Sequence, residues 1–211
     1  MAVDAVFNGE EYIAYRTIPE CIDAVDRNDV DIAVVPLENA IEGTVHLTVD
    51  YLVHQVRLPI FAEIVVPIQQ HLLTHKDFSG DLADITAIYS HTQAIAQCHQ
   101  FIHQHIPQAQ IHYTTSTARA AELVSESSEP IVAIGNKLSA DEYGLRILRE
   151  NIHDYPNNHT RFAVLAKEKE HIRINRPDHD GEKTTLLVTL PSDHAGALHQ
   201  VLSAFAWRKM N

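Results

Sequence analysis

Five consecutive side chains that can form hydrogen bonds precede an apolar run near residue 160. They are Asn157, Asn158, His159, Thr160 and Arg161, and the run is Phe162–Ala166, which is typical of a strand. In an extended chain alternate side chains share a face. Asn158, Thr160 and Phe162 are therefore predicted on one face, with His159 and Arg161 on the other. Thr160 and Arg161 are not expected to point at the same part of a ligand.

Small neutral polar residues also stand where other predicted strands end. They are Asn39, Ser90, Thr115 and Ser116, and Gln97 lies one helix length beyond Ser90. In open α/β sheets ligands bind beyond the carboxyl ends of strands, where loops lead into helices. Amides, hydroxyls and a single Arg suit the orientation of an anion and mild proton donation, rather than hydrolysis by a strong nucleophile.

Helix capping is the alternative interpretation of these strand exits. An N-cap residue followed by Glu or Gln three positions later forms a capping box. The candidates are the pairs Asn39–Glu42 and Ser90–Gln93, and either Ser116 or Thr117 for the helix that follows. A cap and a ligand contact are compatible, since a helix N-terminus that needs an acceptor also accepts a carboxylate.

Several other functions are disfavoured by the sequence. The GxGxxG, GxxxxGK[ST], GxSxG and HExxH motifs do not occur, and the net charge of −12 argues against a nucleic-acid partner. His99 and His103 could share a helix face, but without further ligands nearby we expect solvated positions rather than a metal site. No cofactor is indicated.

Composition favours a globular protein that stays in the cytoplasm. The 211 residues are 45% hydrophobic, and no apolar run approaches the roughly 20 residues that span a bilayer. The N-terminus lacks the pattern of a secretory signal. Cys21 and Cys98 lie in apolar, helix-like contexts and are expected to be reduced core thiols.

Short apolar runs alternate with amphipathic segments, which predicts an α/β fold with largely parallel sheets. Predicted strands are Tyr12–Tyr15, Ile32–Pro36, Phe61–Ile68, Ile85–Tyr89, Ile111–Thr114, Ile131–Ile134 and Phe162–Ala166. Predicted helices are Ile18–Asn28, Val45–Val56, Thr92–His105, Thr117–Ser125 and Asn136–Tyr143, and residues 2–7 also suggest a helix.

The character of the sequence changes after residue 168. Residues 169–183 are charged and contain Pro177 and Gly181, which indicates a linker. A predicted strand, "TTLLVTLP", and a helix with Leu198, Val201, Leu202 and Phe205 inward follow. One strand and one helix do not close a core, so residues 184–211 look like the first part of a second domain.

The order of several motifs resembles prephenate dehydratases over nearly the whole chain. The motifs are "VVPLENAIEGTV", "SHTQAIAQC", "TTSTARAAE", "GLRILRENIHDYPNNHTRF" and "GALHQVL". The most specific part is the Asn-x-Thr-Arg-Phe element, Asn158 to Phe162.

The resemblance implies a catalytic domain, residues 1–168, of two α/β lobes similar to type II periplasmic binding proteins, with the active site in the cleft between them. The first lobe would comprise residues 1–66 and 156–168, and the second 67–155. Residues 184–211 would begin an α+β (ferredoxin-like) ACT domain, in which Gly196, Ala197 and Leu198 match the motif that binds the effector phenylalanine. Family members are dimers or tetramers.

The activity implied is the decarboxylating dehydration of prephenate to phenylpyruvate in phenylalanine biosynthesis. The resemblance assigns the key catalytic hydroxyl to Thr160. It gives substrate orientation to Asn39, Ser90 and Gln97, places Thr115 and Ser116 in the same cleft, and adds Arg161 and Phe162 to the motif. For Arg161 a structural ion pair, with a residue such as Glu38 or Asp154, is the alternative.

Three departures from the family pattern stand out. Ala40 replaces the usual Ser, the N-terminal strand with its Gly-Pro-x-Gly-Thr loop is absent, and so is the second half of the ACT domain. We therefore expect a fragment with a gap in the first lobe, little activity and little inhibition by phenylalanine. A non-catalytic module that binds an organic or amino acid is the rival interpretation. Whether a chorismate mutase domain precedes Met1 stays open.

Overall fold

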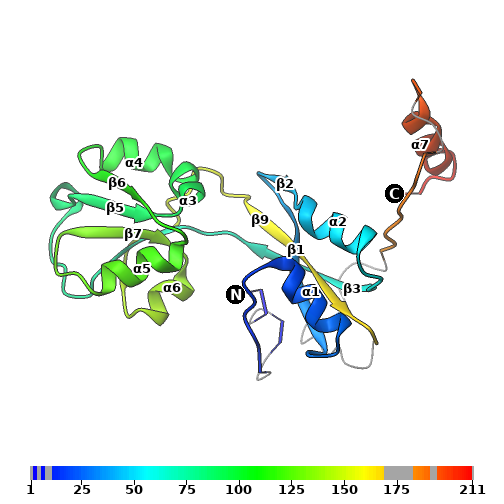
Figure 1. The fold of residues 1–211 in the computed structure, drawn as a ribbon. Coiled ribbons are helices and arrows are strands. Elements are labelled where there is room, and N and C mark those ends of the chain that lie inside the picture. Colours follow the sequence, from blue (N-terminus) through cyan, green and yellow to red (C-terminus); the bar gives the residue numbers. More distant parts are fainter. Residues whose placement is uncertain (1, 4–5, 8–10, 169–182, 191–193, 211) are drawn as a thin grey trace. The chain divides into compact units, whose positions relative to one another are not determined.

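The computed structural model describes all residues except 1, 4–5, 8–10, 169–182, 191–193 and 211. The chain divides into two compact units, Met1–Asn175 and Arg176–Asn211. The larger unit contains two separate β-sheets with helices on their faces (Figure 1).

The first sheet carries Thr160 and has the strand order β2-β1-β9-β3. Its strands are β1 (Ile32–Asn39), β2 (Gly43–Thr44), β3 (Ile60–Pro67) and β9 (His159–Ala166). Every pairing in it is antiparallel, and the register places Asn39 opposite Thr160 and Glu38 opposite Arg161. The end of β1 therefore lies beside the start of β9.

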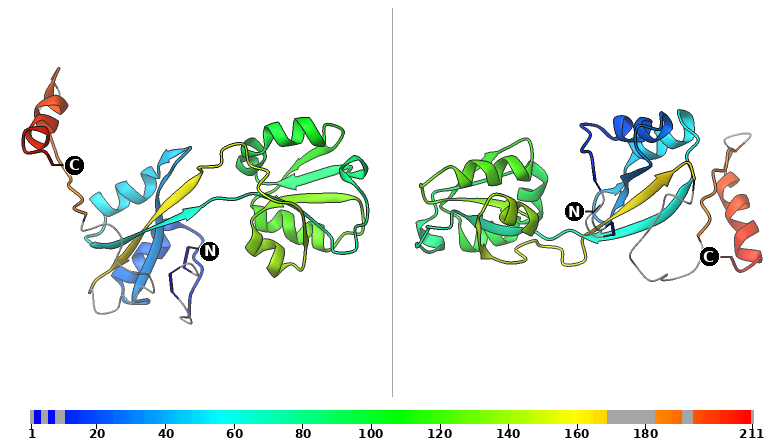
Figure 2. Two further views of the ribbon diagram at one scale, coloured as in Figure 1. Left: turned by 180° about the vertical axis from the view of Figure 1, so that it is seen from behind. Right: turned by 90° about the horizontal axis from the view of Figure 1, so that it is seen from below.

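Helices α1 (Ile18–Asp26) and α2 (His46–His54) cover one face of this sheet (Figure 2). The Thr17 side chain caps α1 by accepting the Glu20 N–H at 3.3 Å. Ile22 and Val25, three residues apart, then face the sheet and are fully buried. The buried core on this side consists of Ile22, Val25, Ala33, Val35, Leu58, Ala163 and Leu165.

The N-terminal segment packs on the opposite face of the first sheet. Val6 and Phe7 are buried against Ile64, Val66 and Val164. The described residues among 2–7 form a turn, not the predicted helix, while residues 4–5 lie outside the described part of the chain.

The second sheet has the strand order β6-β5-β7-β4-β8. Its strands are β4 (His71–Thr74), β5 (Ala87–Ser90), β6 (Gln110–Tyr113), β7 (Ile131–Gly135) and β8 (Arg146–Arg149). The pairs β5–β6 and β5–β7 are parallel, whereas β4 is antiparallel to both neighbours. The expected largely parallel arrangement is therefore found only around β5. The antiparallel strands β4 and β8 were not predicted, and β9 belongs to the first sheet.

Helices cover both faces of the second sheet (Figure 1). They are α3 (Thr92–Gln97), α4 (His99–His105), α5 (Thr117–Ser125) and α6 (Lys137–Glu142), and a 3₁₀ turn spans Leu82–Asp84. Alternation along β4 explains the two cores: Leu72 packs with α3 and α4, and Leu73 packs with α5 and α6.

The predicted helix Thr92–His105 is interrupted at Cys98. Asp154 stabilises the break from a distant part of the chain. Its backbone N–H donates to the carbonyl of Gln97 at 2.7 Å, and its carboxylate accepts the N–H of Gln100 at 3.1 Å. Both bonds satisfy groups that a break in the helix leaves without partners.

The predicted strand Tyr12–Tyr15 is wrong. Residues 11–15 carry no strand, and no described strand pairs with Ile32–Pro36 on the side opposite β9. An apolar segment becomes a strand only where a partner supplies its backbone hydrogen bonds. The gap that the family resemblance predicts in the first lobe stays a prediction.

Two segments connect the sheets, residues 68–70 and 150–158, and they are hydrogen bonded to each other. Ile68 N–H donates to the carbonyl of Asn158, and Ile152 N–H donates to the carbonyl of Gln70, both at 2.9 Å. These bonds therefore fix the backbone of two polar residues, Gln70 and Asn158.

The second unit contains helix α7 (Ala197–Trp207), which begins after Gly196 in the left-handed region, at φ +92°. Residues 184–190 form no strand, and Leu198 and Leu202 are mostly exposed, contrary to the inward orientation expected of them. Val201 and Phe205, the other two residues expected to point inward, are partly buried. The linker expected at 169–183 lies outside the described residues except for Lys183.

Candidate active site

Asn39, Asn158 and Thr160 form a hydrogen-bonded cluster where β1 meets β9. Nδ2 of Asn39 donates to Oγ1 of Thr160 at 2.9 Å and to Oδ1 of Asn158 at 3.2 Å. Thr160 and Asn158 are both buried, at 9% and 3% exposure. The three side chains are brought together from positions up to 121 residues apart.

The backbone of the following turn fixes the orientation of the Asn39 amide. Its Oδ1 accepts the N–H groups of Ile41, at 2.9 Å, and Glu42, at 3.1 Å. These bonds close a turn rather than begin a helix, since α2 starts only at His46. The capping box predicted for Asn39 and Glu42 is therefore wrong, although the Oδ1 of Asn39 does accept the N–H of Glu42.

The bond from Asn39 determines how the Thr160 hydroxyl can form hydrogen bonds. Because Asn39 can only donate from Nδ2, the Thr160 oxygen is an acceptor in this bond. The Thr160 hydroxyl hydrogen is then available to a ligand. Donation to the oxygen also polarises the hydroxyl, which makes it a better donor.

Arg161 follows Thr160 directly in β9, so its side chain is on the opposite face of the strand. There it pairs with two carboxylates. Its guanidinium contacts the Glu38 carboxylate directly and lies 3.7 Å from Glu63. This is the structural ion pair named as the alternative for Arg161, with Glu38 as the partner. A contact between Arg161 and substrate stays a prediction.

Phe162 contributes to the apolar support of the cluster. It packs on the buried residues Ile64, Val66 and Val164, on the face of the sheet that also carries Thr160. The side chain therefore holds β9 against its neighbours. A direct role toward substrate stays a prediction.

Ser90 is fully buried at the end of β5, and its hydroxyl donates to the carbonyl of Ile134 at 2.7 Å. The predicted cap is wrong, because α3 is capped by His91, whose ring nitrogen accepts the Gln93 N–H at 3.3 Å. Ser90 can offer only its oxygen lone pairs to another group.

Gln97, at the end of α3, has a partner that sequence analysis missed. Gln70 donates from Nε2 to Oε1 of Gln97 at 3.4 Å, and both side chains are more than 90% buried. Oε1 of Gln70 has no hydrogen-bond partner. The signal in the sequence was a pair of amides, Gln69-Gln70, between two apolar runs.

Thr115 and Ser116 are exposed in the loop after β6. Ser116 caps α5, as predicted, with its hydroxyl oxygen accepting the N–H of Arg119 at 3.0 Å. In the second unit Gly196 and Leu198 are exposed and Ala197 is buried.

Two titratable groups beside these elements have shifted pKa values. Burial lowers the pKa of His71, whose Nδ1 accepts the N–H of Asn151 at 3.1 Å. Burial raises the pKa of Cys98 to about 12, and both cysteines are free thiols. Among the described residues no three His, Cys, Asp or Glu side chains are grouped as metal ligands, and no helix there is long and apolar enough to cross a bilayer.

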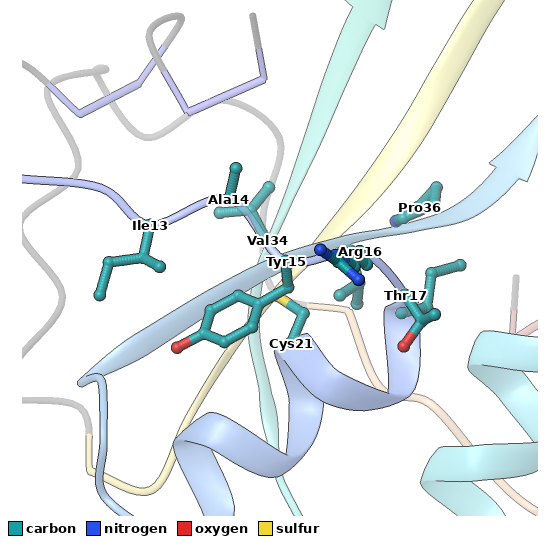
Figure 3. Close-up of a pocket in the computed structure, with 10 residues that line it drawn as sticks. Ile13, Ala14, Tyr15, Arg16, Thr17, Cys21, Val34 and Pro36 are labelled. Atoms are coloured by element: carbon teal, nitrogen blue, oxygen red, sulfur yellow. The ribbon is translucent and has the colours of Figure 1, made fainter. Parts of the chain in front are cut away.

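A cavity of about 290 Å³ lies along the open edge of β1 (Figure 3). Tyr15, Cys21, Val34 and Pro36 are among the residues that line it. None of the predicted site residues lines it. We therefore place the candidate site at the Asn39–Asn158–Thr160 cluster.

Comparison with known proteins identifies the family of this chain. A family model described as prephenate dehydratase matches residues 1–170. The chain belongs to the prephenate dehydratase family. The prephenate dehydratase of Bacillus subtilis is 49% identical over all of this chain and 75% of its own length. That of Lactococcus lactis is 40% identical over all of this chain and 74% of its own length.

A solved structure agrees with this assignment. The prephenate dehydratase of Arthrobacter aurescens, in complex with L-Phe, is 32% identical with a TM-score of 0.76. The match covers 99% of this chain and 69% of that one. The resemblance inferred from the motifs is confirmed, and the fold is the periplasmic-binding-protein-like α/β fold of this family.

Proposed function

We propose that Thr160 is the proton-donating hydroxyl in the reaction of this chain, the conversion of prephenate to phenylpyruvate. The observation that carries the proposal is the bond from Asn39 to the Thr160 oxygen, which leaves the hydroxyl hydrogen for the substrate. A positioned proton donor accelerates such a step typically ~10²–10⁴-fold.

The reaction needs little more than a held substrate and an assisted leaving group. The bond to the ring carboxylate breaks and releases carbon dioxide, its electron pair completes the aromatic ring, and the ring hydroxyl leaves. Thr160 donates to that departing oxygen, and one proton from solvent balances the release of water. Charge on the leaving oxygen is greatest in the transition state, so a donor aimed there lowers the barrier.

The remaining residues have supporting roles in this proposal. Asn39 orients Thr160, and Ser90, Gln97, Thr115 and Ser116 orient the substrate. Arg161, paired with Glu38 and Glu63, supports β9, and its guanidinium would also contact a carboxylate of the substrate. The two sheets correspond to the two lobes, with residues 1–66 and 156–168 in the first and 67–155 in the second.

Regulation is proposed by analogy with the phenylalanine-bound relative. Residues 184–211 would belong to an ACT domain, and Gly196, Ala197 and Leu198 would contribute to an L-phenylalanine site. We also propose a cytoplasmic location and homo-oligomerisation.

The test is phenylpyruvate formation from prephenate by the purified chain, with the uncatalysed reaction subtracted. Product above that background supports the dehydratase. Binding of prephenate without product would instead support the organic-acid binding module.

A further inference from the structure

Asn158 has an unusual environment for a buried amide. The side chain is 3% exposed, and its Oδ1 accepts from Asn39. Its Nδ2 is buried and has no hydrogen-bond partner. An unpaired buried donor costs about 1–3 kcal/mol, and native proteins retain few of them.

The direction of this amide follows from its neighbours. The Oδ1 atom of Asn39 is held by Ile41 and Glu42, so Asn39 presents Nδ2 to Asn158. Asn158 must accept this hydrogen bond with its Oδ1, which turns its own Nδ2 away from Asn39. Exchanging the nitrogen and oxygen of Asn158 would set two donors against each other.

The backbone of Asn158 is fixed as well. Its N–H donates to the carbonyl of Tyr155 at 3.2 Å, and its carbonyl accepts from Ile68 at 2.9 Å. The side chain cannot satisfy Nδ2 by a large backbone shift without breaking these bonds. Asn158 immediately precedes β9, and its side chain lies beside that of Thr160, because both accept a hydrogen bond from Nδ2 of Asn39.

We propose that Asn158 is a substrate-binding residue of the dehydratase, and that its Nδ2 donates a hydrogen bond to a carboxylate oxygen of prephenate. The inference deepens the proposed function, since it assigns a second donor to the site of Thr160. A donor already stripped of water and held in position forms this bond at little reorganisation cost. A hydrogen bond to a charged group is worth about 1.5–3 kcal/mol, or roughly 10- to 150-fold in kcat/KM.

Asn158→Asp is the sharpest test, because it keeps the oxygen that faces Asn39 and replaces only the donor. We expect KM for prephenate to rise at least about tenfold near pH 8, since a carboxylate repels the dianion. The defect should shrink as the pH falls toward about 6 and the buried carboxyl gains a proton that it can donate. Asn157→Asp, which adds the same charge at the exposed neighbouring residue, is the matched control and should change KM by less than about twofold.

Asn158→Ala keeps the inference testable if the buried carboxylate disturbs folding. We expect kcat/KM to fall about tenfold or more, beyond the effect of a modest fall in melting temperature, since the variant removes the unpaired donor and also the oxygen that accepts from Asn39. A kcat/KM within twofold of the parent in both Asn158 variants would overturn the inference. So would losses that are independent of pH and follow the melting temperature, which would make Asn158 structural. Failure of the proposed function is distinct, because the unmodified chain would then form no phenylpyruvate.

Discussion

The Nδ2 of Asn39 lies 2.9 Å from the Oγ1 of Thr160 and donates a hydrogen bond to it. Since the Asn39 oxygen is committed to two backbone N–H groups, this amide has one orientation only. The bond makes the Thr160 oxygen an acceptor and leaves its hydroxyl hydrogen to be donated to another group. This relationship connects the antiparallel register of β1 and β9 to the chemistry of the family.

Ser90→Ala should lower stability as well as activity. The buried hydroxyl donates to the carbonyl of Ile134, which the variant leaves without this donor. Loss of such a bond costs about 1–2 kcal/mol in the free energy of unfolding, measured by urea titration. Unchanged stability combined with a large loss of activity would contradict a structural role for this hydroxyl.

Arg161→Ala should destabilise the first sheet, because it leaves the carboxylates of Glu38 and Glu63 without their shared cation. All three side chains are partly exposed, so we expect a loss of about 1 kcal/mol that shrinks at high salt. Addition of Glu38→Gln to Arg161→Ala should recover part of it. Arg119→Ala, which breaks the exposed pair with Glu122 on α5, is the matched control. Equal, salt-independent losses in the Arg161 and Arg119 variants would argue against the paired-carboxylate explanation.

Stability should depend on pH through His71. Its folded pKa is lowered by burial, and Glu150 opposes the shift while His153 and Lys137 add to it. The unfolded chain therefore binds a proton more readily than the folded one, so this contribution is complete above about pH 6.5 and is lost as the pH falls below that value. His71→Asn keeps an acceptor near the N–H of Asn151 and should flatten the dependence of the urea midpoint on pH. An unchanged pH profile in that variant would exclude His71 as the cause.

Part of the hydrogen-bonded cluster was accessible from the sequence, because polar residues at strand ends are typical of ligand positions in α/β folds; its role toward substrate stays a proposal. Thr160 and Asn39 were both identified, and the period of two separated Thr160 from Arg161. Their hydrogen bond was not predictable, since the register of β1 and β9 joins residues 121 apart. The same limit applies to Ser90, whose partner Ile134 lies on another strand.

The errors in the fold also come from long-range contacts. Asp154 ends α3 from a position beyond residue 150, so no local pattern near Cys98 reveals the break. Tyr12–Tyr15 has the composition of a strand but no described partner. Strands β4 and β8 were missed because they are short and their hydrogen-bond partners are distant in sequence.

The most direct test of the account compares Thr160→Ala with Thr160→Ser in phenylpyruvate formation. We predict that Thr160→Ala lowers kcat by about 10²-fold or more, whereas Thr160→Ser keeps part of the activity because the hydroxyl remains. Thr86→Ala, at an exposed threonine outside the cluster, is the control and should leave kcat unchanged. A Thr160→Ala variant that forms phenylpyruvate at the rate of the parent chain would contradict the central claim.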